Sequence, residues 1–112
     1  MISKFFIYYN NDVMINFDLI HGFEFIESAE EAIINLISID GRAFTEISFE
    51  CPDGDNNILQ KVDDIFEELC LFKAMVEYKK ENNDTLTIGD MSEFKHLHPM
   101  GKYPNLIRIS LD

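Results

Sequence analysis

The chain has little of what most recognisable functional sites are built from. Its 112 residues include no Trp, only two Cys, three Pro and five Gly. Two cysteines, Cys51 and Cys70, make neither a disulfide framework nor a zinc ribbon, and they suit a reducing compartment. The sequence has no glycine-rich phosphate-binding loop, and neither cysteine has the basic neighbours that would activate a thiolate. These absences disfavour most enzyme classes, and we expect a protein without catalytic activity or cofactor.

Positive charge is also scarce. Nine Lys and Arg stand against 21 Asp and Glu, which leaves a formal net charge of −12. Residues 1–70 hold 15 acidic and 3 basic side chains, whereas residues 71–112 hold 6 of each. Such a charge repels nucleic acid and anionic membranes, so a charged partner should be basic.

Long apolar runs are missing as well. No 18 consecutive apolar residues occur, so the sequence predicts no membrane-spanning helix. The apolar run at the amino terminus is shorter than a signal-peptide core, and we expect a cytoplasmic protein. The 46% hydrophobic content with ten Phe is that of a folded protein, and the length predicts a single domain over residues 1–112.

The clearest periodic signal lies between Asn57 and Lys80. Apolar residues there alternate at spacings of four and three, which places them on one face of a helix. They are Ile58, Val62, Ile65, Leu69, Phe72 and Val76. Residues 72–80 also alternate in polarity, so a helix that ends near Leu71 and continues as a strand is the alternative.

A second helix is predicted over residues 28–38. Ser28 and Glu31 have the Ser-x-x-Glu spacing of a capping box, and Asp40-Gly41 follows as a helix exit. Alternating or wholly apolar patterns predict strands at 2–9, 13–19, 23–26, 43–51, 85–88 and 106–111. The succession of strand, helix and strand over residues 23–51 favours a parallel crossover. Residues 89–104 have no period and predict an ordered loop.

The predicted fold class is therefore α+β. We expect a mainly antiparallel sheet of five or six strands with two helices packed on one face.

The candidate partner-binding surface consists of carboxylates. They come from two predicted helices, a strand and the turn between them, and they would face a basic partner and accelerate its association. The candidate residues are Glu30, Glu31, Glu46, Glu50, Asp53, Asp55, Asp63, Asp64, Glu67 and Glu68. Phe44, Phe66 or Tyr8 would supply the aromatic anchors that the centre of an interface needs.

Two other interpretations use the carboxy-terminal part of the chain. His96 and His98 would lie on one face of an extended segment and could be two ligands of a metal-binding protein. Alternatively, the loop at 89–104 could make the protein a self-associating adaptor.

In its small size, strong acidity, many aromatics and lack of a catalytic motif, the chain resembles bacterial immunity proteins of toxin–immunity pairs, including those of contact-dependent growth inhibition. The resemblance covers the whole chain in character and has no signature motif. It implies a cytoplasmic inhibitor that binds a basic toxin domain, commonly a nuclease, and covers its active site with carboxylates. We expect a monomer or weak dimer in the free state.

Overall fold

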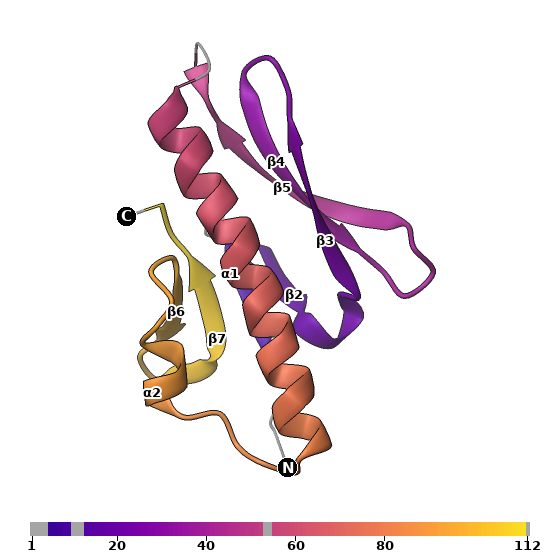
Figure 1. The fold of residues 1–112 in the computed structure, drawn as a ribbon, viewed down its shortest axis with the longest axis vertical. Helices are drawn as coiled ribbons and strands as arrows, with labels where there is room; N and C mark the ends of the chain where they lie inside the picture. Colours follow the sequence, from indigo (N-terminus) through magenta and orange to yellow (C-terminus); the bar gives the residue numbers. More distant parts are fainter. Residues whose placement is uncertain (1–4, 10–12, 53–54, 112) are drawn as a thin grey trace.

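The computed structural model describes residues 5–9, 13–52 and 55–111. In this part of the chain, seven strands form two sheets beside one long helix, so the α+β class is confirmed. Figure 1 shows the helix running the length of the molecule, with β3, β4 and β5 on one side of it and β6 and β7 on the other. The prediction of one sheet of five or six strands with two helices on one face is wrong.

The four-stranded sheet joins the two ends of the chain. Its order is β2 (Val13–Asn16), β1 (Phe6–Tyr9), β7 (Tyr103–Ile109) and β6 (Leu97–Met100). The outer pairs are antiparallel, but β1 and β7 run parallel, which makes this sheet mixed. β1 and β2 lie within the strands predicted at 2–9 and 13–19 and pair as an antiparallel hairpin, while residues 10–12 between them lie outside the described residues. The second strand ends earlier than predicted, because residues Phe17–Leu19 form a 3-10 turn capped by the Asn16 side chain.

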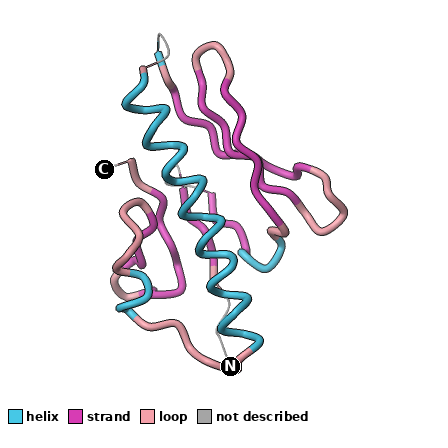
Figure 2. The backbone as a smooth tube through the Cα atoms, in the orientation of Figure 1, coloured by secondary structure: helices cyan, strands magenta, loops and turns pink. Residues whose placement is uncertain are grey.

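The three-stranded sheet is an antiparallel meander of β3 (Gly22–Glu27), β4 (Glu31–Ile37) and β5 (Ala43–Glu50). The helix predicted at 28–38 is therefore wrong, and so is the parallel crossover. Ser28 does not cap a helix: its backbone N–H and its hydroxyl both donate to the Glu31 carbonyl, at 2.9 Å and 3.4 Å, which closes a turn between strands. Figure 2 shows the two hairpin loops of this sheet at its opposite ends.

The error at β4 has a physical cause. Apolar residues at 32, 33, 36 and 37 satisfy a helical spacing, but 32, 34 and 36 also satisfy the two-residue period of a strand. Ala32, Ile34 and Leu36 are fully buried, while the residues between them are half-buried or exposed. Three β-branched isoleucines in seven positions favour the strand, and pairing on both sides stabilises it.

The long helix α1 (Asn56–Glu81) is continuous, so the helix is confirmed and the strand alternative for residues 72–80 is wrong. Its amino-terminal cap is Asp55, because the Asp55 carboxylate accepts from the Asn57 N–H at 2.9 Å. The predicted stripe is buried along its length. The buried helix residues are Val62, Ile65, Leu69, Phe72 and Val76.

The segment after α1 differs from its prediction. The strand expected at 85–88 is wrong, because α2 (Ile88–Met91) begins there and the residues before it belong to neither a strand nor a helix. Thr87 and Asp90 cap this short helix reciprocally, at 2.9 Å and 3.1 Å between side chains and backbone N–H groups. The loop expected at 89–104 contains β6 and the start of β7, whereas the final strand is confirmed.

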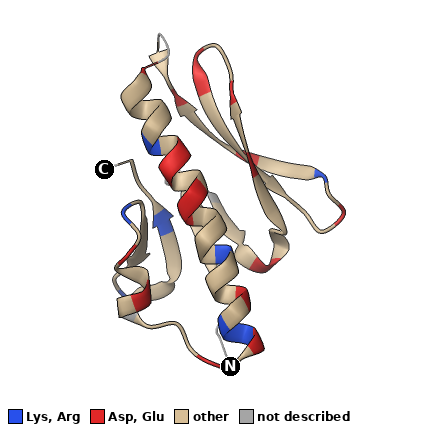
Figure 3. Cartoon of the chain, viewed as in Figure 1, with Lys and Arg blue, Asp and Glu red and all other residues tan. Residues whose placement is uncertain are grey.

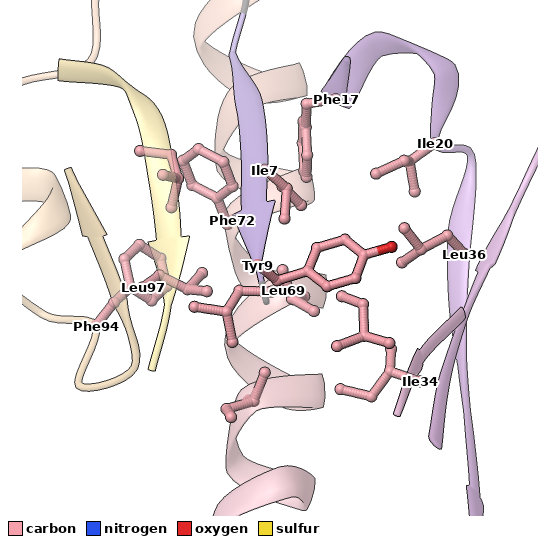
Figure 4. Packing of buried hydrophobic residues seen from close by; sticks show 14 of the residues in the cluster. Ile7, Tyr9, Phe17, Ile20, Ile34, Leu36, Leu69, Phe72, Phe94 and Leu97 are labelled. Atoms are coloured by element: carbon pink, nitrogen blue, oxygen red, sulfur yellow. The ribbon is translucent and has the colours of Figure 1, made fainter. Parts of the chain in front are cut away.

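The core lies between α1 and the inner faces of both sheets. Figure 4 shows Ile7 and Tyr9 of β1 between the helix residue Leu69 and residues Ile34 and Leu36 of the three-stranded sheet. The Tyr9 hydroxyl donates to the Glu46 carbonyl at 3.4 Å, which links the two sheets directly. Because burial fixes the inner face of each sheet, the outer faces are free to carry function.

Candidate functional site

The outer face of the three-stranded sheet is the face that points away from α1. Along β4, Ala32, Ile34 and Leu36 face the helix and the core, so Glu31, Ile33, Asn35 and Ile37 face outward. Residues of β3 and β5 that pair with these outward residues of β4 face outward as well. The candidate site is built from this register.

Four glutamates share this outer face. Glu24 and Glu46 flank Asn35 on either side, and Glu31 lies directly opposite Glu50. We call these four residues the acidic sheet face. Figure 3 shows acidic residues distributed over all three strands of this sheet. None of the four forms an ion pair with any residue in the described part of the chain.

Neutral side chains hold two of these carboxylates in place. The Asn35 amide donates to Glu24 Oε1 at 3.2 Å, and the Ser48 hydroxyl donates to Glu31 Oε2 at 3.0 Å. Neither bond neutralises charge. Like charges directly opposite on paired strands are destabilising, so the Glu31–Glu50 pair stores repulsion that a bound cation would relieve.

At the end of this face the carboxylates line a groove. Glu30, Glu31 and Glu50 surround a volume of about 300 Å³ together with Pro52. The Cys51 N–H donates to the Glu30 carbonyl at 2.8 Å and fixes the chain after β5 against the turn between β3 and β4. Three carboxylates around one groove can accept the hydrogen bonds of a guanidinium or an ammonium group. We call it the acidic groove.

The carboxylates predicted on the helix do not join this face. Successive helix residues are turned by about 100°, so Asp63, Asp64 and Glu67 point in different directions from α1. Asp63 lines a groove beside Phe25 of β3, Asp64 accepts from the Gln60 amide at 3.0 Å, and Glu67 is exposed. Since α1 covers the inner side of the three-stranded sheet, the ten predicted residues do not form one surface.

Two of the ten residues contribute to the fold. Asp55 caps α1. The Glu68 carboxylate is turned toward the start of β6, where Oε1 accepts from the His96 N–H at 2.9 Å and the side chain is largely buried. Asp53 lies outside the described residues.

Glu24 is not among the ten residues that were predicted to bind a partner. It alternates with Phe23 and Phe25, which pack against the core, so the period of the strand at 22–27 already placed it on the other face. Its neighbours Asn35 and Glu46 are 11 and 22 positions further along the chain, and only the pairing of three strands brings them together.

The three aromatic anchors predicted from the sequence, like the predicted carboxylates, lie on different surfaces of the molecule. Phe44, on β5 two residues before Glu46, is 43% exposed. Phe66 stacks on Phe25 with 6.0 Å between ring centroids, inside the packing of α1 on β3. Tyr8 lies on the outer face of the other sheet, beside Met14 and Arg108. Only Phe44 is placed beside the acidic sheet face.

The two histidines have different surroundings. His96 is buried, with Nδ1 2.9 Å from the Ser110 carbonyl and Nε2 4.0 Å from Glu68 Oε2, whereas His98 pairs with Arg108 across β6 and β7. In the segments that the structure describes, no group of three or more His, Cys, Asp or Glu side chains could hold a metal ion.

The cysteines have no activating partner in the described residues. The buried Cys51 thiol donates to the Asp55 carbonyl at 3.3 Å. Burial, with a smaller contribution from the charge of Glu67, raises the pKa of Cys70 above its usual value, so its thiol stays protonated at neutral pH. A protonated thiol is a poor nucleophile.

Comparison with protein-family models, curated proteins and solved structures finds no match to this chain. Among the helices of the described residues, none combines the length and the apolar character needed to cross a membrane.

Proposed function

We propose that this protein is a non-catalytic inhibitor that binds a basic toxin enzyme and covers its active site, as an immunity protein does. The observation that carries the proposal is the acidic sheet face, where four glutamates share one sheet surface and have no ionic partner among the described residues. An enzyme that acts on nucleic acid binds phosphates with Lys and Arg, and carboxylates at similar spacing would compete for the same side chains.

The rigidity of this face supports the proposal. Its carboxylates stand on paired strands rather than on loops, so little backbone freedom remains to be lost on binding. The repulsion between Glu31 and Glu50 is relieved when a cation enters, which adds to the binding free energy. The acidic groove offers a site where one Lys or Arg of the partner becomes surrounded by carboxylates.

Long-range attraction supports it as well. A net charge of −12 steers a basic protein toward this chain, and oriented charge raises association rates from a neutral value of about 10⁵–10⁶ M⁻¹s⁻¹ toward 10⁸ M⁻¹s⁻¹ at low salt. An inhibitor that must act before its toxin reaches a substrate benefits from such a rate.

The test uses the purified product of the gene immediately upstream as the partner. We expect a complex at low salt, loss of the partner's enzymatic activity in that complex, and an association rate that falls steeply as salt is raised. The double variant Glu31→Lys/Glu50→Lys should slow association by at least about tenfold at low salt, because it removes the charge that steers and seats the partner.

A matched control separates local charge from net charge. Glu67→Lys/Glu81→Lys changes the net charge by the same amount, at two exposed positions of α1. It should slow association far less than the sheet variant. Equal slowing by both variants would show that the total charge acts without a specific face, and a partner that stays fully active when mixed with this protein would refute the proposal.

A further inference from the structure

An exposed apolar groove lies at the other end of the same sheet. Leu19, Ile39 and Phe44 line it with Asp18 and Ser38, and its volume is about 320 Å³. Leu19 is 60% exposed, Ile39 is 86% exposed and Phe44 is 43% exposed. Three large apolar side chains that remain in contact with water at one place mark a surface suited to binding. We call this the apolar groove.

The β4–β5 turn that carries Ile39 is held by its own hydrogen bonds. The Ser38 N–H donates to the Arg42 carbonyl at 2.9 Å, and the Gly41 N–H donates back to Ser38 at 3.0 Å. Asp40 accepts from the Ser38 hydroxyl and from the Arg42 N–H, bonds that hold the pKa of its carboxyl below the usual range. Gly41, with φ of +84°, completes the turn in a conformation that favours glycine. Ile39 is thus presented to solvent by an ordered turn.

Leu19 is held against this turn from the other side. It ends the 3-10 turn Phe17–Leu19, in which the Ile20 N–H donates to Phe17 at 3.1 Å. The following His21 N–H donates to the Ile37 carbonyl at 2.7 Å, which fixes the 3-10 turn to the end of β4. In Figure 1 the chain before β3 and the β4–β5 loop lie at the same end of the three-stranded sheet. The groove is therefore formed before any partner binds.

The apolar groove and the acidic groove lie near opposite ends of the three-stranded sheet. Glu31 and Ile37 are six residues apart on β4, which at about 3.3 Å per residue separates the two ends by roughly 20 Å. Carboxylates border the apolar end too, because Asp18 lines the groove and Glu46 follows Phe44 by two residues on β5. Asp18 is already paired with Lys80 at 2.8 Å, whereas Glu46 forms no ion pair with any residue that the structure describes.

We infer that the basic partner of the proposed function seats a large apolar side chain in the groove formed by Leu19, Ile39 and Phe44, with a Lys or Arg beside it facing Glu46. This inference rests on the proposed function and names the contact chemistry of its partner. A second Lys or Arg, about 20 Å away along the strands, occupies the acidic groove. Charge complementarity selects this occupant over a second copy that would pair symmetrically through the same face, since such a pairing would bring together two surfaces of the same negative sign.

The two ends act differently in binding. Carboxylates steer the partner and set the association rate, whereas a desolvated apolar anchor sets how long the complex lasts. Loss of the contact between the partner's apolar side chain and the apolar groove should therefore raise the dissociation rate of the complex. The association rate and its dependence on salt should stay nearly unchanged.

The first arm of the test uses two short peptides with blocked ends, Arg-Leu-Arg-Leu-Arg and Arg-Ser-Arg-Ser-Arg, added at millimolar concentration to the full chain. We expect the leucine peptide to shift the NMR methyl signals of Leu19 and Ile39 and to leave those of Leu71 in place. Leu71 is the matched reference, because it is 62% exposed on α1, away from the groove. The serine peptide has the same charge and should not shift these methyl signals. Equal shifts at Leu71, or none at Leu19 and Ile39, would overturn the inference.

The second arm uses the product of the upstream gene. Leu19→Ser should raise its dissociation rate at least tenfold, and Leu71→Ser, which removes an equally exposed leucine, should not. If the wild-type chain does not bind this product, the proposed function fails, while the peptide arm still decides whether the groove takes a cationic apolar ligand. If the product binds and the two variants dissociate at the same rate, the groove inference fails and the proposed function stands.

Discussion

The two sheets bury similar faces against one helix and present different faces to solvent. The outer face of the four-stranded sheet carries Met14, Tyr8, Arg108 and His98 in one row across its four strands, and none of these is acidic. Next to this row, a groove of about 360 Å³ is lined mostly by apolar and aromatic residues, with Lys102 and Asn105 among them. The outer face of the three-stranded sheet carries four glutamates instead.

This difference teaches which features the fold requires. Burial explains the inner faces of both sheets, because the same alternation places their apolar residues against α1. It does not explain why the carboxylates gather on one outer face, where Glu31 and Glu50 repel each other across paired strands. Folding alone would favour a mixture of charges, so the segregation is consistent with selection for a basic partner.

The largest expected effect concerns how each sheet is attached to α1. The Phe72 ring contacts Phe5, Phe17 and Phe94, with centroid distances of 5.5, 4.9 and 5.9 Å, along the border of the four-stranded sheet. Phe72→Ala should lower the free energy of unfolding by about 3–5 kcal/mol, measured by urea denaturation. Phe66→Ala, which loses only the half-buried stacking on β3, should cost less than half as much. Equal losses would mean that both sheets depend on α1 to the same extent.

The next effect is a difference in unfolding free energy between variants of two neighbouring glutamates of α1. Glu68→Ala removes the acceptor of the buried His96 N–H and should cost about 1–3 kcal/mol of unfolding free energy. Glu67→Ala, at an exposed position one residue earlier, should change it by less than about 0.5 kcal/mol. Glu68→Gln keeps an oxygen acceptor and should recover part of the loss. If Glu67→Ala were the more damaging change, the assignment of Glu68 to the fold would be wrong.

The third effect is a gain in stability. Glu31→Lys places opposite charges across β4 and β5 and should raise the free energy of unfolding by about 0.2–1 kcal/mol, measured by thermal and urea denaturation. Glu50→Lys should do the same, and the double variant should lose the gain because two lysines then face each other. A coupling energy near zero in this double-mutant cycle would show that the pair stores no repulsion.

Most of the secondary structure could be predicted from the sequence, since one period dominated each segment. Up to Leu71 the stripe of α1 has only a helical period, and β3, β5 and β7 have only the strand period, whereas residues 72–80 fit both periods and continue the helix. In β4 the residues around Ile33 and Ile34 fit both periods, and strand pairing decided between them. Within β6, Pro99 interrupts the pattern of a four-residue strand, which left no signal to detect.

The candidate site could be predicted only in part. Glu31, Glu46 and Glu50 lie on one sheet face, but the assumption that acidic residues close in sequence share a surface does not apply to α1, where each residue points in a new direction. The apolar groove had no sequence signal, because Leu19, Ile39 and Phe44 belong to three segments that meet only in the folded chain.

The smallest expected effect is a pH-dependent change in stability, for which Asp40 in the β4–β5 turn is compared with Asp84 after the end of α1. Hydrogen bonds from Ser38 and the Arg42 N–H lower the pKa of Asp40 below its usual 3.8, and the Thr85 N–H and Lys79 lower that of Asp84. A carboxyl whose pKa is lower in the folded state stabilises that state above the unfolded pKa, and this contribution disappears as the pH falls through the folded pKa. The melting temperature of Asp40→Asn should therefore lie below that of the wild type near pH 5 and approach it near about pH 2.

Salt distinguishes the two carboxylates. Asp40 is bonded within its own turn by neutral donors, so added NaCl should leave the difference between Asp40→Asn and the wild type nearly unchanged. Asp84 also forms an exposed ion pair with Lys79 at 3.3 Å, so the difference caused by Asp84→Asn should shrink in salt. A salt-sensitive Asp40 would mean that a charged side chain, rather than the bonds of the turn, holds the β4–β5 loop. The loop that presents Ile39 would then be less ordered than the apolar groove requires.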